Sequence, residues 1–284
     1  MNKINLLFDN RLAALGTKHK KETVIAPLFA KELNIKIKVP QNLDTDNFGT
    51  FTLDKKRPGN QKETALLKAR IAMKMLNLDI GIASEGIFGP HPAVPFGVIN
   101  TEIVVFIDNK LNLEIFGGHT EKVNYAQSIT AFNLDEVLEF ANRINFPNQG
   151  IVIKSSEKKY SDMVKGLVNK EELITTASIY LEKYKSIWLE TDFRAHVNQL
   201  RMKNIELATK NLIENIKRQC PNCYSLGFHR IDPKLGLPCQ QCGRPTSCIL
   251  YDVYECNKCQ YTADIIYPNK DQVADPRYCD YCNP

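Results

Sequence analysis

All nine cysteines of the chain lie between residues 220 and 282, and eight of them form four Cys-x-x-Cys pairs. Each pair presents two thiolates at the spacing of a zinc knuckle, and two such pairs complete a tetrahedral site. Disulfide bonds are the alternative, but the N-terminal residues lack the apolar core of a secretory signal, so we expect reduced thiols. The sequence therefore predicts two structural zinc ions, held by Cys220, Cys223, Cys239, Cys242, Cys256, Cys259, Cys279 and Cys282.

The spacing leaves open which pairs share an ion. Successive pairs are separated by 15, 13 and 19 residues. Consecutive pairing makes two short zinc ribbons, whereas nested pairing would place residues 251–254 in a ribbon bounded by Cys242 and Cys256. We favour consecutive pairing, with Cys248 left as an ordinary thiol. A closed four-thiolate site has no position for substrate, so residues 219–284 are expected to form a structural double zinc ribbon.

Positive charge is concentrated outside this tail. The chain carries a formal charge of +5 at pH 7, but residues 219–284 hold six Lys and Arg against seven Asp and Glu. Each four-thiolate zinc site adds a net charge of about −2, because four thiolates outweigh one Zn²⁺. Such a tail does not favour nucleic acid, whereas the basic remainder suits a small phosphorylated ligand. No apolar run could span a bilayer, so we expect no membrane association and a cytoplasmic location.

Residues 63–89 are the most informative stretch outside the tail. Apolar residues recur there at helical spacing, and Asn60 and Glu63 stand three apart, as the partners of a capping box do. A short buried strand follows directly and ends at Glu85, and open α/β sheets place their sites at such strand ends. We therefore predict an α/β fold with a mixed, mostly parallel sheet and flanking helices.

The remaining pattern sets the limits of this domain. Strand and helix signals alternate over residues 1–200, and residues 201–218 repeat apolar positions with the period of one long connecting helix. Two further elements are a strand over residues 4–8 and a helix over residues 158–168. The predicted organisation is thus an α/β domain, a connecting helix and the cysteine-rich tail.

Two segments carry a resemblance to a known superfamily. Residues 63–69, Glu-Thr-Ala-Leu-Leu-Lys-Ala, resemble the E-N-A-x-x-K-A helix of inosine triphosphate pyrophosphatase-like proteins, and residues 80–86 are similar to the strand and acidic turn that follow it. The resemblance implies a cleft in which a divalent metal, Mg²⁺ or Mn²⁺, assists hydrolysis of a nucleoside triphosphate to the monophosphate and pyrophosphate. It implies that Glu63 and Glu85 hold the metal or activate water, and that Lys68 meets the phosphates. Taken singly, Glu63 is also explained as a helix cap and Lys68 as a solvated side chain.

Two loops add candidate ligand contacts. Thr17, Lys18, His19 and Lys21 lie between a strand and a helix, where basic side chains can grip a phosphate. In the resemblance Thr17 and Lys21 stand for the polar phosphate loop of the superfamily, with a spacing that differs by one residue; a solvated basic loop is the alternative. His91 lies in a proline-rich loop after the buried strand and is a candidate general acid or base, or merely exposed.

A second polar group follows the single tryptophan of the chain. Glu190 and Asp192 are candidate Mg²⁺ ligands, and Arg194 and Arg201 are candidate bidentate partners of a phosphate or carboxylate. The alternative is an internal set of ion pairs that fixes the junction between a strand and a helix.

Three motifs together with the tail resemble one bacterial family to which no function is assigned. The motifs are T-K-H-K-K-E at residues 17–22, S-E-G-x-F-G-P-H-P at residues 84–92 and E-T-D-x-R-A-H-x-N at residues 190–198, with a tail that ends C-D-Y-C-N-P. This resemblance spans nearly the whole chain but implies no chemistry. The predicted function is therefore metal-dependent hydrolysis of a nucleotide or related phosphate compound. The alternative is a zinc-ribbon module that binds protein or RNA on a non-catalytic α/β scaffold.

Overall fold

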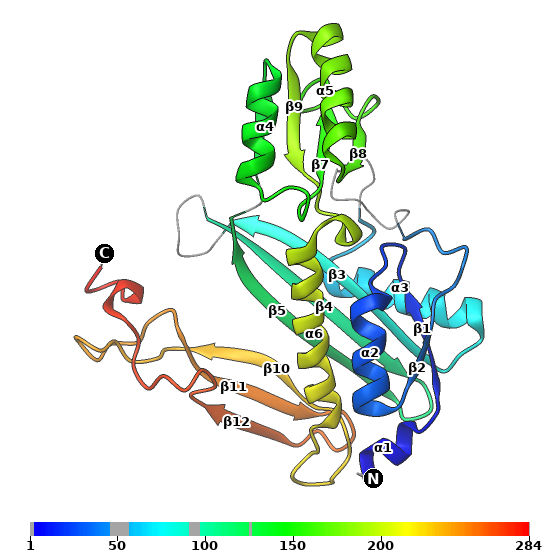
Figure 1. Cartoon of the computed structure of the whole chain (residues 1–284). Helices are drawn as coiled ribbons and strands as arrows, with labels where there is room; N and C mark the ends of the chain where they lie inside the picture. The colour runs from blue at the N-terminus through cyan, green and yellow to red at the C-terminus, as the bar shows by residue number, and fades with distance from the viewer. Residues whose placement is uncertain (1–2, 46–56, 91–96, 125–126, 284) are drawn as a thin grey trace. The chain divides into compact units, whose positions relative to one another are not determined.

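The computed structural model of the protein describes residues 3–45, 57–90, 97–124 and 127–283 (Figure 1). It is a mixed α/β structure with helices on its sheets. No helix in these ranges is both long and apolar enough to cross a membrane.

The chain divides into two compact units. The first comprises Met1–Asn112 and Phe116–Leu212, and the second comprises Leu113–Ile115 and Ile213–Pro284. The border falls inside the long helix α6 (Gln199–Lys217), so the predicted connecting helix contributes to both units.

A five-stranded sheet with the order β2-β1-β3-β4-β5 forms the centre of the first unit. β1 runs parallel to β2 and β3, whereas β3 and β4 are antiparallel. The sheet is thus mixed, but the expectation that it is mostly parallel is corrected. The short turn between β4 and β5 can only reverse the chain, because a parallel connection needs a longer crossover. The strands are β1 Leu12–Gly16, β2 Lys36–Lys38, β3 Ile80–Pro90, β4 Val98–Asp108 and β5 Leu113–Val123.

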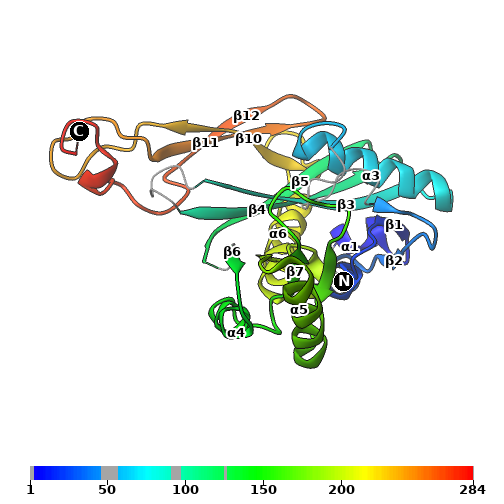
Figure 2. The same ribbon diagram turned by 90° about the horizontal axis from the view of Figure 1, so that it is seen from above.

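Helices cover both faces of this sheet. Figures 1 and 2 show α3 (Gln61–Leu76) on one face and α6 on the other, where α2 (Glu22–Leu33) also packs. α3 approaches the strands through small buried side chains such as Ala65 and Ala69, and Gly81 of β3 makes room for Met73. The predicted capping box at the start of α3 is present. Residues 4–8, expected as a strand, belong instead to the short helix α1 (Lys3–Phe8).

A separate four-stranded antiparallel sheet, ordered β6-β9-β7-β8, lies within the same unit. Two helices pack on it around a core that includes Phe140, Ile153 and Leu189. Residues 158–168, expected as a helix, instead contain strand β8, because Leu167 pairs with Ile151 and is buried in that core. The elements are β6 Ser128–Ala131, α4 Leu134–Arg143, β7 Ile151–Lys154, β8 Val164–Leu167, α5 Lys170–Tyr184 and β9 Ile187–Thr191.

The second unit is built on a three-stranded antiparallel sheet. Its strands are β10 (Phe228–Leu235), β11 (Ile249–Cys256) and β12 (Thr262–Ile266), with β11 in the middle. All nine cysteines belong to this unit.

Two neighbouring glycines of β5 provide a test of how α6 packs on the sheet. A methyl group added at Gly117 would lie 2.2 Å from the backbone nitrogen of Leu212, whereas one added at Gly118 would meet nothing closer than 3.6 Å. Because a backbone atom cannot move aside freely, Gly117→Ala should lower the free energy of unfolding by about 1 to 3 kcal/mol. Gly118→Ala should leave it nearly unchanged in the same urea denaturation. Equal stability of the two variants would contradict this packing.

Candidate functional site

Two four-cysteine clusters that could hold metal ions form in the second unit. One contains Cys220, Cys223, Cys256 and Cys259, and in each cluster the four Sγ atoms lie within 4.8 Å of one another. A zinc–sulfur distance of about 2.3 Å places the sulfur atoms of a tetrahedral site about 3.8 Å apart. The Sγ atoms of Cys220 and Cys259 are 3.6 Å apart, so the cluster fits such a site. The other cluster contains Cys239, Cys242, Cys279 and Cys282.

The first pair of cysteines thus joins the third, and the second joins the fourth. The prediction of consecutive pairing is wrong, and so is the nested alternative. The register of the sheet explains this, because Phe228 pairs with Cys256 and brings the first pair beside the third. An isolated bridge between Cys239 and Ala274 brings the second pair toward the segment before the fourth. Cys248 is in neither cluster, as predicted.

The local geometry of the four pairs is nearly the same. The N–H of the residue after each pair donates to the carbonyl of the first cysteine, at 2.9 Å in every case. The tight turn requires a positive φ at that residue in three pairs, namely Tyr224, Gly243 and Gln260. Gly243 is the residue best suited to this conformation, because it carries no Cβ. Each pair is thus a tight turn closed by its own hydrogen bond, which holds its two cysteines close together.

In the first unit, polar side chains gather where β1 ends beside β3. β1 pairs with β3 only as far as Gly16 and Ala83, and β3 continues to Pro90. No described strand pairs with the next carbonyls on that edge of β3, and side chains satisfy them instead. Lys21 Nζ donates to the carbonyl of Ser84 at 3.3 Å, and Arg57 Nη2 donates to that of Gly86 at 3.0 Å. We call Lys21, Arg57, Lys68, Ser84 and Glu85 the Lys21–Glu85 cluster.

The strongest pair of this cluster joins Lys68 of α3 to Glu85 of β3. Lys68 Nζ lies 2.8 Å from Glu85 Oε1, and both side chains are buried. Burial alone would raise the pKa of Glu85, but Lys68 and Lys21 outweigh it, so the pKa lies below its ordinary value. Arg57 Nε is 3.8 Å from the same oxygen. Lys68 is therefore not a solvated side chain, and Glu85 is ionised at neutral pH.

Lys21 is the other buried lysine of the cluster, and its amine contacts Ser84, whereas that of Lys68 contacts Glu85. It precedes α2, is 6 % exposed, and its Nζ donates to Ser84 Oγ at 2.9 Å. Burial, and then the charge of Arg201, lower the pKa of Lys21 from 10.5 to about 7. Part of the Lys21 population is therefore neutral at physiological pH.

Arg201 enters this region from α6 and is almost fully buried. Its Nε donates to Glu102 Oε1 of β4 at 2.7 Å, and both side chains are at most 2 % exposed. Asn204, one turn later on α6, donates to Asn100 of β4 at 2.9 Å. These contacts fix α6 on the sheet. Arg201 is predicted to bind a ligand, but its guanidinium already pairs with Glu102, so a ligand would have to share Arg201 with that carboxylate.

Glu63 and Glu85 have separate partners. Glu63 is exposed, and its Oε2 accepts from the backbone N–H of Asn60 at 2.9 Å as part of the capping box. Gln61 Nε2, by contrast, donates to the carbonyl of Glu85 at 2.8 Å. Two residues correspond to about 200° around a helix, so Glu63 points away from the face that carries Gln61 and Lys68. The start of α3 meets Glu85 as expected, but the Glu63 carboxylate is not brought to it.

The other residues of the first loop differ in exposure and have contacts outside the cluster. Thr17 is buried and its Oγ1 accepts from the N–H of His19 at 3.3 Å, whereas Lys18 is exposed and pairs with Asp44 at 2.9 Å. The His19 ring stacks on His196, with the ring centres 4.9 Å apart. Loss of water on the stacked side, followed by His19 and Arg194, lowers the pKa of His196 to about 4. His91 lies outside the described residues.

The residues expected around the tryptophan form internal ion pairs. Asp192 accepts from Arg194 through both oxygens and from the backbone N–H of Gly166 at 2.9 Å. Glu190 pairs with Lys154 at 2.8 Å on β7. Neither carboxylate belongs to a metal-ligand cluster of the described residues. These contacts match the alternative prediction, in which the group fixes the junction between β9 and α6.

Arg57 and Ser84 of the cluster, and the neighbouring Glu102, were not singled out from the sequence as functional residues. Ser84 begins the motif at residues 84–92 but receives no role there, and Arg57 carries no distinguishing pattern. Glu102 does carry one, because it directly precedes the continuous apolar run of residues 103–107 in a strand that is buried throughout this stretch. A carboxylate at a buried position needs a buried cation, and that signal leads to Arg201.

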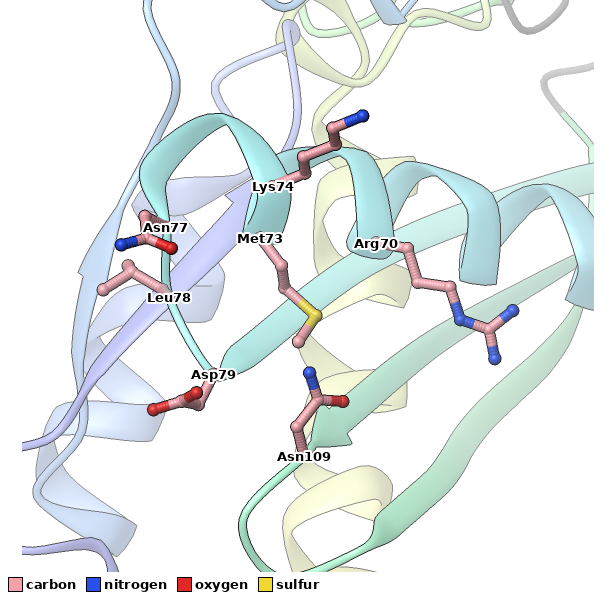
Figure 3. Close-up of a pocket in the computed structure, with 7 residues that line it drawn as sticks. All are labelled: Arg70, Met73, Lys74, Asn77, Leu78, Asp79 and Asn109. Carbon is pink, nitrogen blue, oxygen red and sulfur yellow. The ribbon is translucent and has the colours of Figure 1, made fainter.

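A shallow pocket with a volume of about 370 Å³ lies at the other end of α3 (Figure 3). Arg70 and Lys74 of α3 line it together with Asp79 and Asn109. The pocket contains none of the predicted site residues. Asp79 precedes β3 and Glu85 lies six residues later within it, so the pocket is distinct from the Lys21–Glu85 cluster.

Double cysteine substitutions test which Cys-x-x-Cys pairs share a metal ion. Purified protein should contain two zinc ions per chain, one for each four-cysteine cluster. The double variant Cys220→Ser/Cys256→Ser damages one cluster only and should retain about one zinc ion, whereas Cys220→Ser/Cys239→Ser damages both and should retain almost none. Elemental analysis gives the ratio, and Cys248→Ser is the control that should keep both. The reverse result for the two double variants would establish consecutive pairing.

The ion pair between Lys68 and Glu85 also gives a testable stability difference. Lys68→Met leaves a buried carboxylate without its main cation and should lower the free energy of unfolding by about 3 to 5 kcal/mol. Because the pKa of Glu85 is lowered in the folded protein, the pair stabilises it at neutral pH, and this contribution disappears as the pH falls below the ordinary Glu range. The matched control is Lys74→Met, at an exposed position of the same helix, which should change stability by less than about 0.5 kcal/mol. A similar loss in both variants, measured by urea denaturation at several pH values, would argue against the pair.

Comparison with known proteins gives a family but no activity. No curated protein matches the chain. A family model described as a domain of unknown function, DUF6671, matches residues 68–284. This match includes Lys68, Glu85 and all eight paired cysteines, and it covers well over half of the chain, which therefore belongs to the DUF6671 family.

Proposed function

We propose that the first unit binds and hydrolyses a nucleotide or a related phosphate compound at the Lys21–Glu85 cluster, and that the second unit holds two structural zinc ions. The observation that carries the first part is an excess of buried positive charge. Lys21, Lys68 and Arg201 are all at most 6 % exposed, and Arg57 adds a half-buried guanidinium. The carboxylates among them are Glu85 and Glu102. Buried cations without carboxylates are stabilised by a bound anion, and phosphate is an anion that Lys and Arg recognise well.

The position of the cluster supports the same conclusion. It lies just beyond the carboxyl end of the parallel strand β1 and before the first turn of α2. α/β sheets bind ligands at such ends, where a helix N-terminus also favours a negative charge. The resemblance of residues 63–69 and 80–86 to pyrophosphatase-like proteins adds that the anion belongs to a nucleotide.

Each residue of the cluster then has a role that its contacts suggest. Lys21 donates a hydrogen bond to a phosphate oxygen in addition to those it gives Ser84. Lys68 and Arg57 hold Glu85 in its ionised form. Glu85 is the single carboxylate of this cluster and already pairs with these cations, so Mg²⁺ or Mn²⁺ would be held there only together with the phosphates of the substrate. Such a metal, when bound, would acidify a water molecule and neutralise charge on the phosphate. Glu63 can join only if its carboxylate leaves the capping box.

A panel of phosphate compounds tests this proposal. Inorganic phosphate, pyrophosphate and nucleoside di- and triphosphates, each with and without Mg²⁺ or Mn²⁺, should include ligands that raise the melting temperature, because they bind only the folded chain. The best ligand should be hydrolysed with release of phosphate or pyrophosphate. Glu85→Gln is nearly isosteric and should lower that rate at least about a hundredfold, in the range that loss of an essential polar group gives.

The control for this assay is Lys74→Met, which changes an exposed lysine of α3 and should leave the rate unchanged. If no phosphate compound raises the melting temperature and none is hydrolysed, the proposal fails. If Glu85→Gln retains full activity, hydrolysis occurs at another site.

A second candidate function, docking of protein or RNA, is favoured by one feature of the second unit. Tyr224 and Tyr281 are 73 % and 63 % exposed, and the Arg244 guanidinium lies 3.8 Å above the ring of Tyr281. Exposed aromatic rings of this kind can stack on a nucleobase or pack in an interface. The negative charge of the unit argues against a strong attraction to a phosphate backbone, so tight RNA binding with a steep salt dependence would contradict our preferred assignment.

A further inference from the structure

In the part of the chain that the structure describes, no carboxylate pairs with Lys21. Glu85 is paired with Lys68 at 2.8 Å, and Glu102 is paired with Arg201 at 2.7 Å. Among the described residues, the hydrogen-bond acceptors of Lys21 Nζ are the hydroxyl and the carbonyl of Ser84, and both are neutral. An ammonium group has three N–H donors, so these two contacts leave one for a ligand.

The charged groups that face Lys21 come from every element around it. β3 contributes Glu85 and β4 contributes Glu102, while α3 contributes Lys68 and α6 contributes Arg201. These four charges cancel in sign, and the half-buried Arg57 of the same cluster adds a further positive charge, so a protonated Lys21 lies among more cations than carboxylates. Because burial penalises the charge of Lys21, the amine loses its proton near neutral pH, at a pKa of about 7.

We infer that the site takes up its anionic ligand together with a proton, and that the Lys21 amine receives this proton. The inference rests on the proposed function, because it concerns the anion that the Lys21–Glu85 cluster binds. An anion beside Lys21 favours the ammonium form, and linkage then requires proton uptake wherever the free amine is neutral. Arg201 cannot act in this way, since a guanidinium stays protonated in proteins.

The direction of the pH dependence follows from this coupling. Below neutral pH the amine of the free protein already carries its proton, so the affinity for an anion should change little with pH. Above neutral pH each bound anion must bring a proton from solution, and the affinity should fall about tenfold per pH unit. A site of permanently charged residues would show no such change for an anion whose own charge is constant.

Calorimetry of the full chain counts the protons directly. Inorganic sulfate is the probe, because it remains a dianion over the whole range and any proton uptake belongs to the protein. Titrations at about pH 8, in two buffers with different ionisation enthalpies, should give an uptake approaching one proton per sulfate. At about pH 5.5 the uptake should be close to zero. Sulfate binding without proton uptake at the higher pH would overturn the inference and leave the proposed function intact.

Two variants assign the proton to Lys21. Lys21→Arg keeps the charge but cannot release it, so it should bind sulfate at about pH 8 without proton uptake. Lys31→Met, which changes a highly exposed lysine of the same helix, should behave as the unchanged protein. If Lys21→Arg still takes up a proton, another group is responsible.

Nuclear magnetic resonance of the ligand-free chain follows the protonation of lysine side chains directly and needs no ligand binding. With ¹³C-labelled lysine, one side-chain signal should titrate near neutral pH and should be missing in Lys21→Arg. If every lysine titrates at the ordinary value near 10.5, the inference is wrong. If neither sulfate nor inorganic phosphate binds at any pH, the proposed function fails together with it.

Discussion

The ion pair between Lys68 and Glu85 is the contact on which the candidate site of the first unit depends. A carboxylate buried in the middle of a strand is unstable unless a cation meets it, and α3 supplies that cation from the adjacent layer. The pair also sets the register of the helix on the strand, because Gln61 contacts the Glu85 backbone two turns before Lys68 contacts its side chain. The capping box at Asn60 fixes where this helix begins. A local signal at the helix start thereby places a lysine against a carboxylate seventeen residues later.

Features of the fold that depend on local sequence could be predicted. The residues that reach the Lys21–Glu85 cluster from distant parts of the chain could not. A local stretch of sequence is enough to recognise the apolar periodicity of α3, its capping box and the strand that follows. The predicted end of that strand is too early: Ser84 and Gly86 are typical of turns, yet β3 continues through them to Pro90. Side chains from α3 and from residues 21 and 57 satisfy the exposed edge of the strand, and no local pattern announces such distant partners.

For the four-cysteine clusters, too, the sequence predicts the local structure but not the distant partners. The identity of the eight ligands follows from the Cys-x-x-Cys spacing, because each knuckle is a local structure closed by its own hydrogen bond. The partner of each knuckle is decided by the register of β10 and β11, which sets Phe228 opposite Cys256. Loop lengths between the pairs carry no information about that register. Interleaving then links segments more than thirty residues apart in both clusters, so neither cluster closes on a self-contained ribbon.

The two units are stabilised in different ways, and this difference bears on where function resides. The described core of the second unit is small: besides Cys220, Phe228 and Cys256 it includes buried apolar side chains such as Ile115 and Ile216. In a unit of this size, a metal ion held by each four-cysteine cluster would add its binding free energy to folding. The first unit instead buries extensive apolar clusters around both of its sheets. Within this core, burial disfavours the charged form of Lys21 and lowers its pKa to about 7. The two four-cysteine clusters of the second unit could hold structural metal ions, whereas the binding site that we propose lies in the first unit, at the end of β1.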